Sequence, residues 1–386
     1  MSLNVVKSSP SANVSRMAVG TFFVILGIIF SSWASRIPNI QGHLQLSDGA
    51  WGSVLFALPF GLLTGLPFSA WAVARLGSQR TMLAATLFHI FTLPFIGLAD
   101  ESWVLMIILF FFGLSGNLIN VSVNTQAVAV EALYKRSIMA SFHGLWSLAG
   151  FAGAALGALF ISWGLSPFLH FCIIGGLVLI LLIFAYQHTL ADENAEQKKQ
   201  KVFVMPDRQL LVLGMIAFCG MICEGTMFDW SGIYFKKVVE VPEAYVAVGY
   251  VAFMCSMAAA RFIGDRLAGK FGTFRMIQLN GLLIAAGLLI SVAFPNIISA
   301  TLGFMLVGLG VSTIVPLLYG ETGKTKTMSP GSAITAVSSV GFLGFLFGPP
   351  VIGYISEVTD LRWAFALVSI LGICIVLISS SVKKVQ

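Results

Sequence analysis

The sequence predicts an all-α membrane protein of twelve transmembrane helices, arranged as two six-helix halves related by a pseudo-two-fold axis. Three observations support this fold class: the composition, the succession of apolar segments, and a motif that recurs half a chain apart. Of the 386 residues, 58% are hydrophobic and 10% are charged, and the mean hydropathy is +0.93. Soluble domains carry roughly 25% charged residues, so a chain of this composition needs a bilayer to cover its apolar surface.

A membrane-spanning helix needs about 20 mostly apolar residues, and segments of that kind follow one another along the whole chain. The only sizeable polar loop covers residues 188–208 and is expected to link a first half, 1–187, to a second half, 209–386. Six spans fall in each half. They are placed at 17–36, 49–73, 81–99, 103–130, 138–162, 167–187, 209–234, 244–263, 275–294, 298–319, 333–355 and 363–382.

The basic residues lie almost entirely on one side of the predicted membrane. With the N-terminus inside, all but four of the 22 Lys and Arg residues fall in inner loops and tails, and Arg261 is assigned to that inner set. The four exceptions are Arg36, Lys236, Lys237 and Arg362. Because positive residues favour cytoplasmic loops, we expect a bacterial inner-membrane protein with both termini in the cytoplasm. The net charge of +6 then reflects topology and does not indicate a nucleic-acid partner.

Short motifs repeat in the same order in the two halves. The pattern [RK]-x-G-x-x-R occurs at Arg75–Arg80 after the second span and at Lys270–Arg275 after the eighth, an offset of 195 residues. Glu131 ends the fourth span and Glu321 ends the tenth, and basic residues follow each. Basic inner loops are common in all membrane proteins, but the matched order indicates a duplicated unit. Transporters are often built from two such repeats with a central binding site between them.

This loop pattern, with twelve spans and a central loop, resembles the major facilitator superfamily over essentially the whole chain. The family's loop signature usually reads G-x-L-A-D-R-x-G-R-R, whereas this chain has Ala70 and Ala74 in place of the first glycine and the acidic residue. Four stretches further resemble the branch of MosC-like and fucose-permease-like proteins: 35–40, 124–131, 142–147 and 224–231. The resemblance implies secondary active transport, by alternating access, of a small polar solute such as a sugar, cyclitol or amino-sugar-like compound.

Two acids and a histidine are the candidates for proton coupling. Glu224 and Asp229 lie in the apolar part of the seventh span, separated by about 140° and 7.5 Å along a helix. An ionisable group inside the membrane usually faces a cavity or a charged partner. His143, in the fifth span, has a side chain that changes charge near neutral pH. The structural alternatives are hydrogen-bond acceptors for the acids, an interfacial position for Asp229, and a neutral, hydrogen-bonded His143.

The candidates for substrate binding are amide and aromatic side chains. Asn117, Asn120 and Asn124 form one stripe of the fourth span, and amides both donate and accept hydrogen bonds. Trp146 lies well inside the fifth span, where a flat ring can stack on a sugar or a cation. Trp230 belongs to the branch-like stretch 224–231. The alternatives are hydrogen bonding between helices for the amides and ordinary packing for the tryptophans. Branch members often carry Asp at the position of Asn120.

Charged residues at the two membrane surfaces suggest gates. Arg36 ends the first span on the outer side and is a candidate to contact substrate or to pair with Asp229 when the outer side closes. The alternative is an arginine that merely extends to the interface. The resemblance implies a cytoplasmic gate formed by Arg75, Arg80, Glu131, Lys270, Arg275 and Glu321. The alternative is that these charges only set the orientation of the chain in the membrane.

Nothing in the sequence indicates an enzyme. It contains no G-x-x-x-x-G-K-[ST] motif for a nucleotide, and its five cysteines all lie in apolar runs without the partners of a metal site. We expect a monomer that needs no cofactor or metal and interacts with a small-molecule substrate, protons and membrane lipid. Two other functions stay open, namely a proton-coupled exporter of drugs or metabolites and a non-transporting membrane sensor or assembly subunit.

Overall fold

The computed structural model describes residues 11–134, 138–191, 208–322 and 330–382, and these ranges contain helices and turns but no strand. In the first half the helices are α1 (Ala12–His43), α2 (Asp48–Leu55), α3 (Ala57–Leu76), α4 (Ser78–Ile96), α5 (Ser102–Glu131), α6 (Met139–Ser162) and α7 (Pro167–Tyr186). In the second half they are α8 (Arg208–Lys237), the short η1 (Glu243–Tyr245), α9 (Val248–Phe271), α10 (Thr273–Ala293), α11 (Ile297–Val311), α12 (Ile314–Thr322), α13 (Pro330–Val358) and α14 (Leu361–Val382).

These helices form the twelve predicted spans, because two spans are broken into pairs. The second span consists of α2 and α3, and the tenth consists of α11 and α12. Eleven helical segments of the described chain are long and apolar enough to cross a membrane. The remaining span is the third along the chain, α4. It falls short because it contains Gln79, Arg80 and His89, which lower its hydropathy. The predicted fold class is confirmed.

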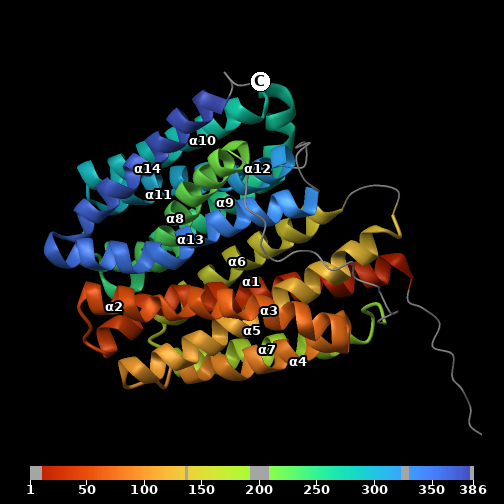
Figure 1. Cartoon of the computed structure of the whole chain (residues 1–386). Helices are drawn as coiled ribbons and strands as arrows, with labels where there is room; N and C mark the ends of the chain where they lie inside the picture. Colours follow the sequence, from red (N-terminus) through yellow and green to blue (C-terminus); the bar gives the residue numbers. More distant parts are fainter. Residues whose placement is uncertain (1–10, 135–137, 192–207, 323–329, 383–386) are drawn as a thin grey trace, which may run out of the picture.

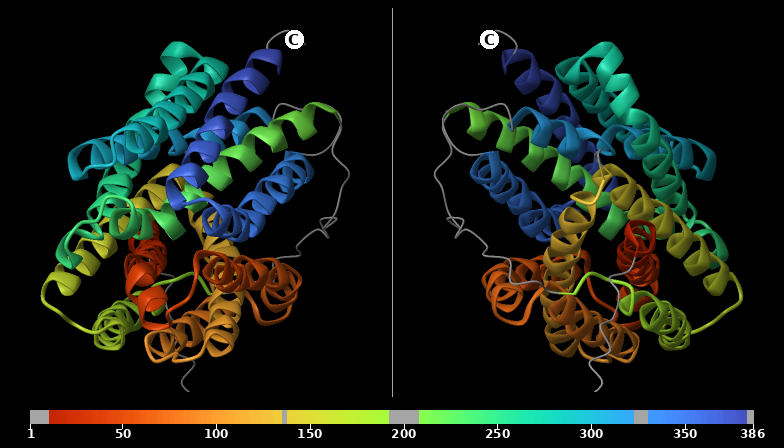
Figure 2. Two further views of the ribbon diagram at one scale, coloured as in Figure 1. Left: turned by 90° about the vertical axis from the view of Figure 1, so that its left-hand side faces the viewer. Right: turned by 90° about the vertical axis from the view of Figure 1, so that its right-hand side faces the viewer.

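The two halves repeat the same packing. Helix α1 packs on α6 and α7 as α8 packs on α13 and α14, and α5 packs on α3 and α4 as α11 packs on α9 and α10. Figure 1 shows α1–α7 in the lower part of the view and α8–α14 in the upper part, and Figure 2 shows the same two groups from the sides. Between the halves, α2 contacts α13 and α6 contacts α9. These two contacts are equivalent under the pseudo-symmetry.

A glycine turn marks the repeat at the level of the backbone. Gly77 joins α3 to α4 with φ 85° and ψ 162°, and Gly272 joins α9 to α10 with φ 87° and ψ 148°. Positive φ is costly for residues that carry a Cβ. A Cβ at Gly272 would meet no neighbour within 4 Å, so the backbone conformation, and not lack of space, requires glycine there. The shared turn explains why this motif recurs at the predicted offset.

Hydrogen bonds join the halves at one end, called the outer end because the charge distribution predicts that it faces away from the cytoplasm. Asp48 at the start of α2 accepts from Lys237 Nζ at 2.6 Å and from Ser356 Oγ at 2.6 Å. The amide of Gly49 donates to Glu357 Oε2 at 3.0 Å. Asn39 donates to Glu243 Oε1 at 2.6 Å. The two halves are therefore closed against each other at the outer end.

Small residues allow the helices to approach at this closure. A Cβ added to Gly52 of α2 would lie 2.7 Å from the carbonyl oxygen of Pro349 in α13. Gly353 of α13 packs on the backbone of Asp48 in the same way. Close backbone approach through glycine is a common mode of helix packing in membranes. The outer closure thus combines backbone contact with the polar bonds around Asp48.

Candidate functional site

A cavity of about 620 Å³ lies between the halves. Helices α1, α2, α3 and α6 line it from the first half, and α8, α9, α12, α13 and the turn before α12 line it from the second. A smaller cavity of about 300 Å³ adjoins it and shares several lining residues, among them Phe30, His143, Trp146 and Arg261. A site at the junction of two repeats, near the middle of the membrane, is where a transporter binds its solute.

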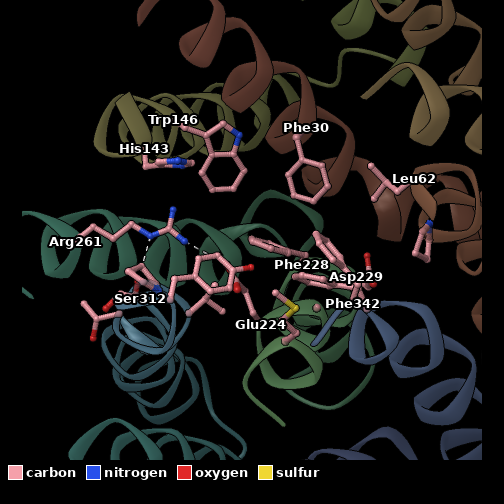
Figure 3. A pocket seen from close by; sticks show the side chains of 18 of the residues that line it. Phe30, Leu62, His143, Trp146, Glu224, Phe228, Asp229, Arg261, Ser312 and Phe342 are labelled. Carbon is pink, nitrogen blue, oxygen red and sulfur yellow. Dashed lines mark hydrogen bonds and ion pairs between the residues drawn. The ribbon is translucent and has the colours of Figure 1, made fainter. Parts of the chain in front are cut away.

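Arg261 of α9 and Glu224 of α8 form a charged pair in the larger cavity (Figure 3). Arg261 Nη2 lies 3.4 Å from Glu224 Oε1, and the two side chains are only 18% and 11% exposed. Arg261 Nη1 donates to Ser147 Oγ of α6 at 2.6 Å, and its guanidinium lies 5.4 Å from the centre of the Trp146 ring. The arginine therefore pairs with an acid of its own half and binds a hydroxyl and an aromatic face of the other half.

The break between α11 and α12 supplies another acceptor for this arginine. Pro316 has no N–H, so the carbonyl of Ser312, four residues earlier, loses its helical donor. Arg261 Nε donates to that carbonyl at 3.3 Å. A proline in the sequence thus creates a backbone acceptor inside the membrane, and the arginine satisfies it.

Asp229 lines the same cavity, about 1.4 turns along α8 from Glu224. Figure 3 shows it toward the side of the view opposite to Arg261. Within the described part of the chain, it makes no side-chain hydrogen bond and no ion pair. Its neighbour Phe228 contacts Phe30 of α1 edge-on, with ring centres 5.0 Å apart. The cavity thus has a polar end around Arg261 and an aromatic end that contains one carboxylate.

The structure brings four of the predicted residues to this cavity. Glu224, Asp229, His143 and Trp146 all line it. His143 is exposed toward it, and its ring packs edge-on against Phe23 at 5.3 Å. Residues predicted from separate stretches of sequence therefore share one site, although their roles in binding or coupling stay predictions.

The three predicted asparagines differ in position: one bonds a neighbouring helix, and another lines a cavity. Asn117 is buried, and its Oδ1 accepts from Ser69 Oγ of α3 at 2.6 Å, so it joins helices and does not line the cavity. Asn120 lines the smaller cavity. Asn124 donates to Asn120 Oδ1 at 2.9 Å. The substrate-binding role predicted for Asn117 is therefore not supported, because its amide faces α3, while Asn120 is positioned for it.

Two further predicted substrate residues lie away from the cavities. Trp230 is completely buried on α8 and lines neither cavity. Arg36 is also buried, and its Nε lies 2.9 Å from Nδ1 of His170 in α7. The structure thus joins Arg36 to a histidine of its own half, and not to Asp229 as the sequence suggests. A partner 134 residues away in the chain cannot be read from local sequence.

The predicted cytoplasmic gate residues lie at the inner helix ends. Arg75, Arg80, Lys270 and Arg275 flank the two glycine turns and are exposed. Glu131 Oε2 accepts from the backbone amides of Ile138 and Met139 at 2.7 and 2.8 Å. Its carboxylate thus caps the N-terminus of α6, where the helix dipole favours negative charge. Glu321 lies in the last turn of α12. A gating role for this set stays a prediction.

Sequence reasoning misses Arg261 as a site residue. The charge pattern assigns it to an inner loop, but α9 continues to Phe271, and Arg261 lies inside the protein against Glu224. The sequence does carry a signal, because Ala258, Ala259 and Ala260 precede it and Phe262 and Ile263 follow it. A basic residue inside such an apolar run needs an acid nearby, and Glu224 is the obvious candidate.

Comparison with known proteins decides the family. The model of the Major Facilitator Superfamily matches residues 14–325. The chain belongs to the major facilitator superfamily. It is 30% identical over 349 residues to an uncharacterised transporter of this type from Yersinia pestis, covering 90% of this chain and 91% of the relative. It is therefore a transporter with a membrane-spanning fold, and not an enzyme.

Two other similarities cover almost the whole chain. The membrane protein MosC of Rhizobium meliloti is 28% identical over 375 residues, which are 96% of this chain and 90% of the relative. A mutant of the nucleoside transporter NupG superposes with a TM-score of 0.79 at 11% identity, covering 95% of this chain and 99% of the other. The first agrees with the predicted branch, and the second shows the common fold.

Proposed function

We propose that this member of the superfamily moves a small polar solute, of the sugar, cyclitol or amino-sugar kind, across the bacterial inner membrane by proton-coupled alternating access. Both termini would lie in the cytoplasm. The observation that supports the proposal is the contact of Arg261 with Glu224 in its own half and with Ser147 and Trp146 in the other. This contact lies in the cavity between the halves, so a change of charge there acts on their relative position.

The coupling follows from the charges. When Glu224 is ionised, its carboxylate competes with the solute and with Ser147 for the donors of Arg261. When a proton binds Glu224, that attraction is lost, and the guanidinium of Arg261 donates instead to Ser147 and to the solute. Proton binding and solute binding are thereby linked through one arginine. States of similar energy suffice for alternating access, so a modest change in this pairing shifts the populations.

The polar end of the cavity suits a hydroxylated ring. Trp146 offers a flat apolar face, and Ser312, Thr313 and Tyr319 line the same cavity. The hydroxyls of Thr313 and Tyr319 accept from Asn280 and Ser338, which leaves their own protons to donate. Hydroxyls both donate and accept hydrogen bonds. A sugar or cyclitol presents an apolar ring face and a rim of hydroxyls, which matches this arrangement.

The test is proton-driven uptake by vesicles that contain the Glu224→Gln variant. The variant keeps the shape of the side chain but cannot ionise, so we expect it to fold and to lose accumulation against a gradient. Downhill exchange of solute should persist. The matched control is Glu101→Gln, because Glu101 is exposed at the membrane surface. Accumulation by Glu224→Gln at the wild-type level would contradict proton coupling through this acid.

A second function, export of amphipathic compounds by the same mechanism, is favoured by one observation. Phe30, Phe228, Phe342 and Phe345 all line the cavity, and they come from both halves. Export predicts that overexpression lowers the cellular content of a lipophilic cation such as ethidium, and that an imposed proton gradient drives the dye out. Import predicts uptake of a hydroxylated solute with no change in dye content.

A further inference from the structure

The charges of the central cavity do not balance. Among its described lining residues the acids are Glu224 and Asp229, and the only Lys or Arg is Arg261. Arg261 already faces Glu224 at 3.4 Å, which leaves Asp229 without a cationic partner among those residues. A carboxylate taken out of bulk water is costly to ionise unless a cation or hydrogen-bond donors compensate it. Asp229 is therefore the acid that no Lys or Arg of the described lining neutralises.

Aromatic rings surround this end of the cavity. Phe228 lies 5.0 Å from Phe30 and 6.5 Å from Phe345, measured between ring centres. Phe342 lies 6.3 Å from Phe345. These four rings form a continuous group across α1, α8 and α13, and all of them line the cavity with Asp229. Ring faces carry negative potential and attract ammonium groups.

The part of the lining that comes from α2 and α3 contains a backbone carbonyl without its helical donor. Pro59 of α3 lacks an N–H, so the carbonyl of Leu55 has no helical donor four residues later. Leu55 and Pro59 both line the cavity. Carboxylate, carbonyl and ring faces all accept positive charge or N–H donors. Their combination in the lining of one cavity favours an ammonium group.

We infer that Asp229 binds an ammonium group of the transported solute, so that the substrate class is amine-bearing and neutral parent compounds are poor ligands. The inference rests on the proposed function, because it places the solute in the same cavity. In this arrangement the amine lies among the phenylalanines beside Asp229, while the remainder of the solute reaches toward Trp146 and Arg261. Within the proposed range of solutes, it selects amino sugars and aminocyclitols over sugars and cyclitols.

The experiment measures binding to the purified full-length protein by isothermal titration with two matched pairs of probes. One pair is glucosamine and glucose, and the other is 2-phenylethylamine and 2-phenylethanol. We expect at least one amine to bind about tenfold or more tightly than its neutral partner, equivalent to about 1.4 kcal/mol. Asp229→Asn should abolish that preference by weakening the amine alone. Asp229→Glu should retain part of it.

Asp100→Asn is the control, since Asp100 is an exposed acid at the membrane surface. Equal binding of both members in each pair would overturn the inference, as would an amine preference that survives in Asp229→Asn. Absence of saturable amine binding to the wild type would also overturn it. The assay involves no flux, so it can fail while Glu224→Gln still abolishes proton-driven accumulation. The reverse outcome would reject the coupling mechanism and leave the amine site intact.

Discussion

Arg261 is the residue on which most contacts of the site converge. It contacts a carboxylate of α8, a hydroxyl and an indole ring of α6, and a backbone carbonyl in the turn before α12. Arginine suits this position because its planar fork donates in several directions and stacks on aromatic faces. Lysine, with a single ammonium, could not satisfy the same set.

Arg261→Met should destabilise the protein by leaving Glu224 in the interior without a counter-ion. Breaking a buried ion pair costs about 3–5 kcal/mol, and the low end applies because both side chains are slightly exposed to the cavity. The double variant Glu224→Gln/Arg261→Met should recover most of this loss. Thermal unfolding of the two variants and the wild type in detergent measures it. Equal melting temperatures for the single and the double variant would show that the pair is not what stabilises this region.

At the scale of the residue, the sequence predicts that Glu224 and Asp229 face a cavity, because membrane-buried acids are rare and costly. It does not resolve the role of Asn117, because an amide stripe on α5 is compatible with a cavity and with a helix neighbour. In the structure the Asn117 amide accepts a hydrogen bond from Ser69 of the neighbouring helix α3, and its role in binding stays a prediction. Arg261 escapes sequence reasoning because an apolar run that meets a charge looks like the end of a span, whereas α9 continues beyond it.

The broken helices are the elements that build the cavity wall. Span two breaks at Phe56, between α2 and α3, and span ten breaks at Ser312–Thr313, between α11 and α12. Each break is followed by a proline that removes one helical hydrogen bond, Pro59 in the first case and Pro316 in the second. Irregular backbone inside a membrane is tolerated where it faces a polar cavity or is buried in protein. Residues beside both breaks line the central cavity.

The α2–α13 contact is the element that closes the outer end, and Gly52→Val should weaken it. A Cβ at Gly52 would lie 2.7 Å from a backbone carbonyl, which cannot rotate away as a side chain could. We expect the variant to populate a form that is open at the outer end. A thiol introduced by Ser53→Cys should therefore react faster with a membrane-impermeant maleimide.

The matched control is Gly176→Val on α7, where an added Cβ meets nothing within 4 Å. Labelling of the protein that keeps Ser53 measures the reaction of the native cysteines, which is subtracted. If Gly52→Val leaves the labelling rate of the introduced thiol unchanged, the glycine contact does not determine closure of the outer end.

At the scale of the whole molecule, two symmetry-related contacts join the halves, α2 with α13 and α6 with α9. The first is reinforced by Asp48, Lys237, Ser356 and Glu357. The ion pair of this network joins Asp48 to Lys237, whose side chains are 11% and 43% exposed, so it holds the closed state and Lys237 can return to water when the outer end opens. Alternating access requires such a balance.

The closed outer end can be locked by a disulfide between Gly49→Cys and Glu357→Cys. An ideal Cβ at Gly49 lies 3.6 Å from Cβ of Glu357, and disulfides join Cβ atoms about 3.5–4.5 Å apart. Oxidation of the double variant should stop transport, and a reductant should restore it. Each single variant serves as a control. Continued transport by fully cross-linked protein would mean that the outer ends need not separate.

The overall fold could be predicted from the sequence because a bilayer constrains span length, charge and topology. The motif around Gly77 recurs around Gly272 and predicts that α3 and α9 are equivalent. The matching backbone angles of the two glycines support this equivalence. The sequence could not give the pairing of Arg36 with His170 or of Arg261 with Ser147. Those contacts depend on how helices distant in the chain are rotated toward one another, and apolar segments leave that rotation undetermined.

The Glu224–Arg261 pair has a kinetic consequence because both residues belong to the same half. In the proposed alternating-access cycle this ion pair moves as one unit, and no opposite charges are pulled apart at the centre of the membrane. What must break there is the hydrogen bond to Ser147 and the stacking on Trp146. Each is worth on the order of 1–2 kcal/mol. Breaking these two contacts costs less than separating the buried ion pair, which would take about 3–5 kcal/mol by itself.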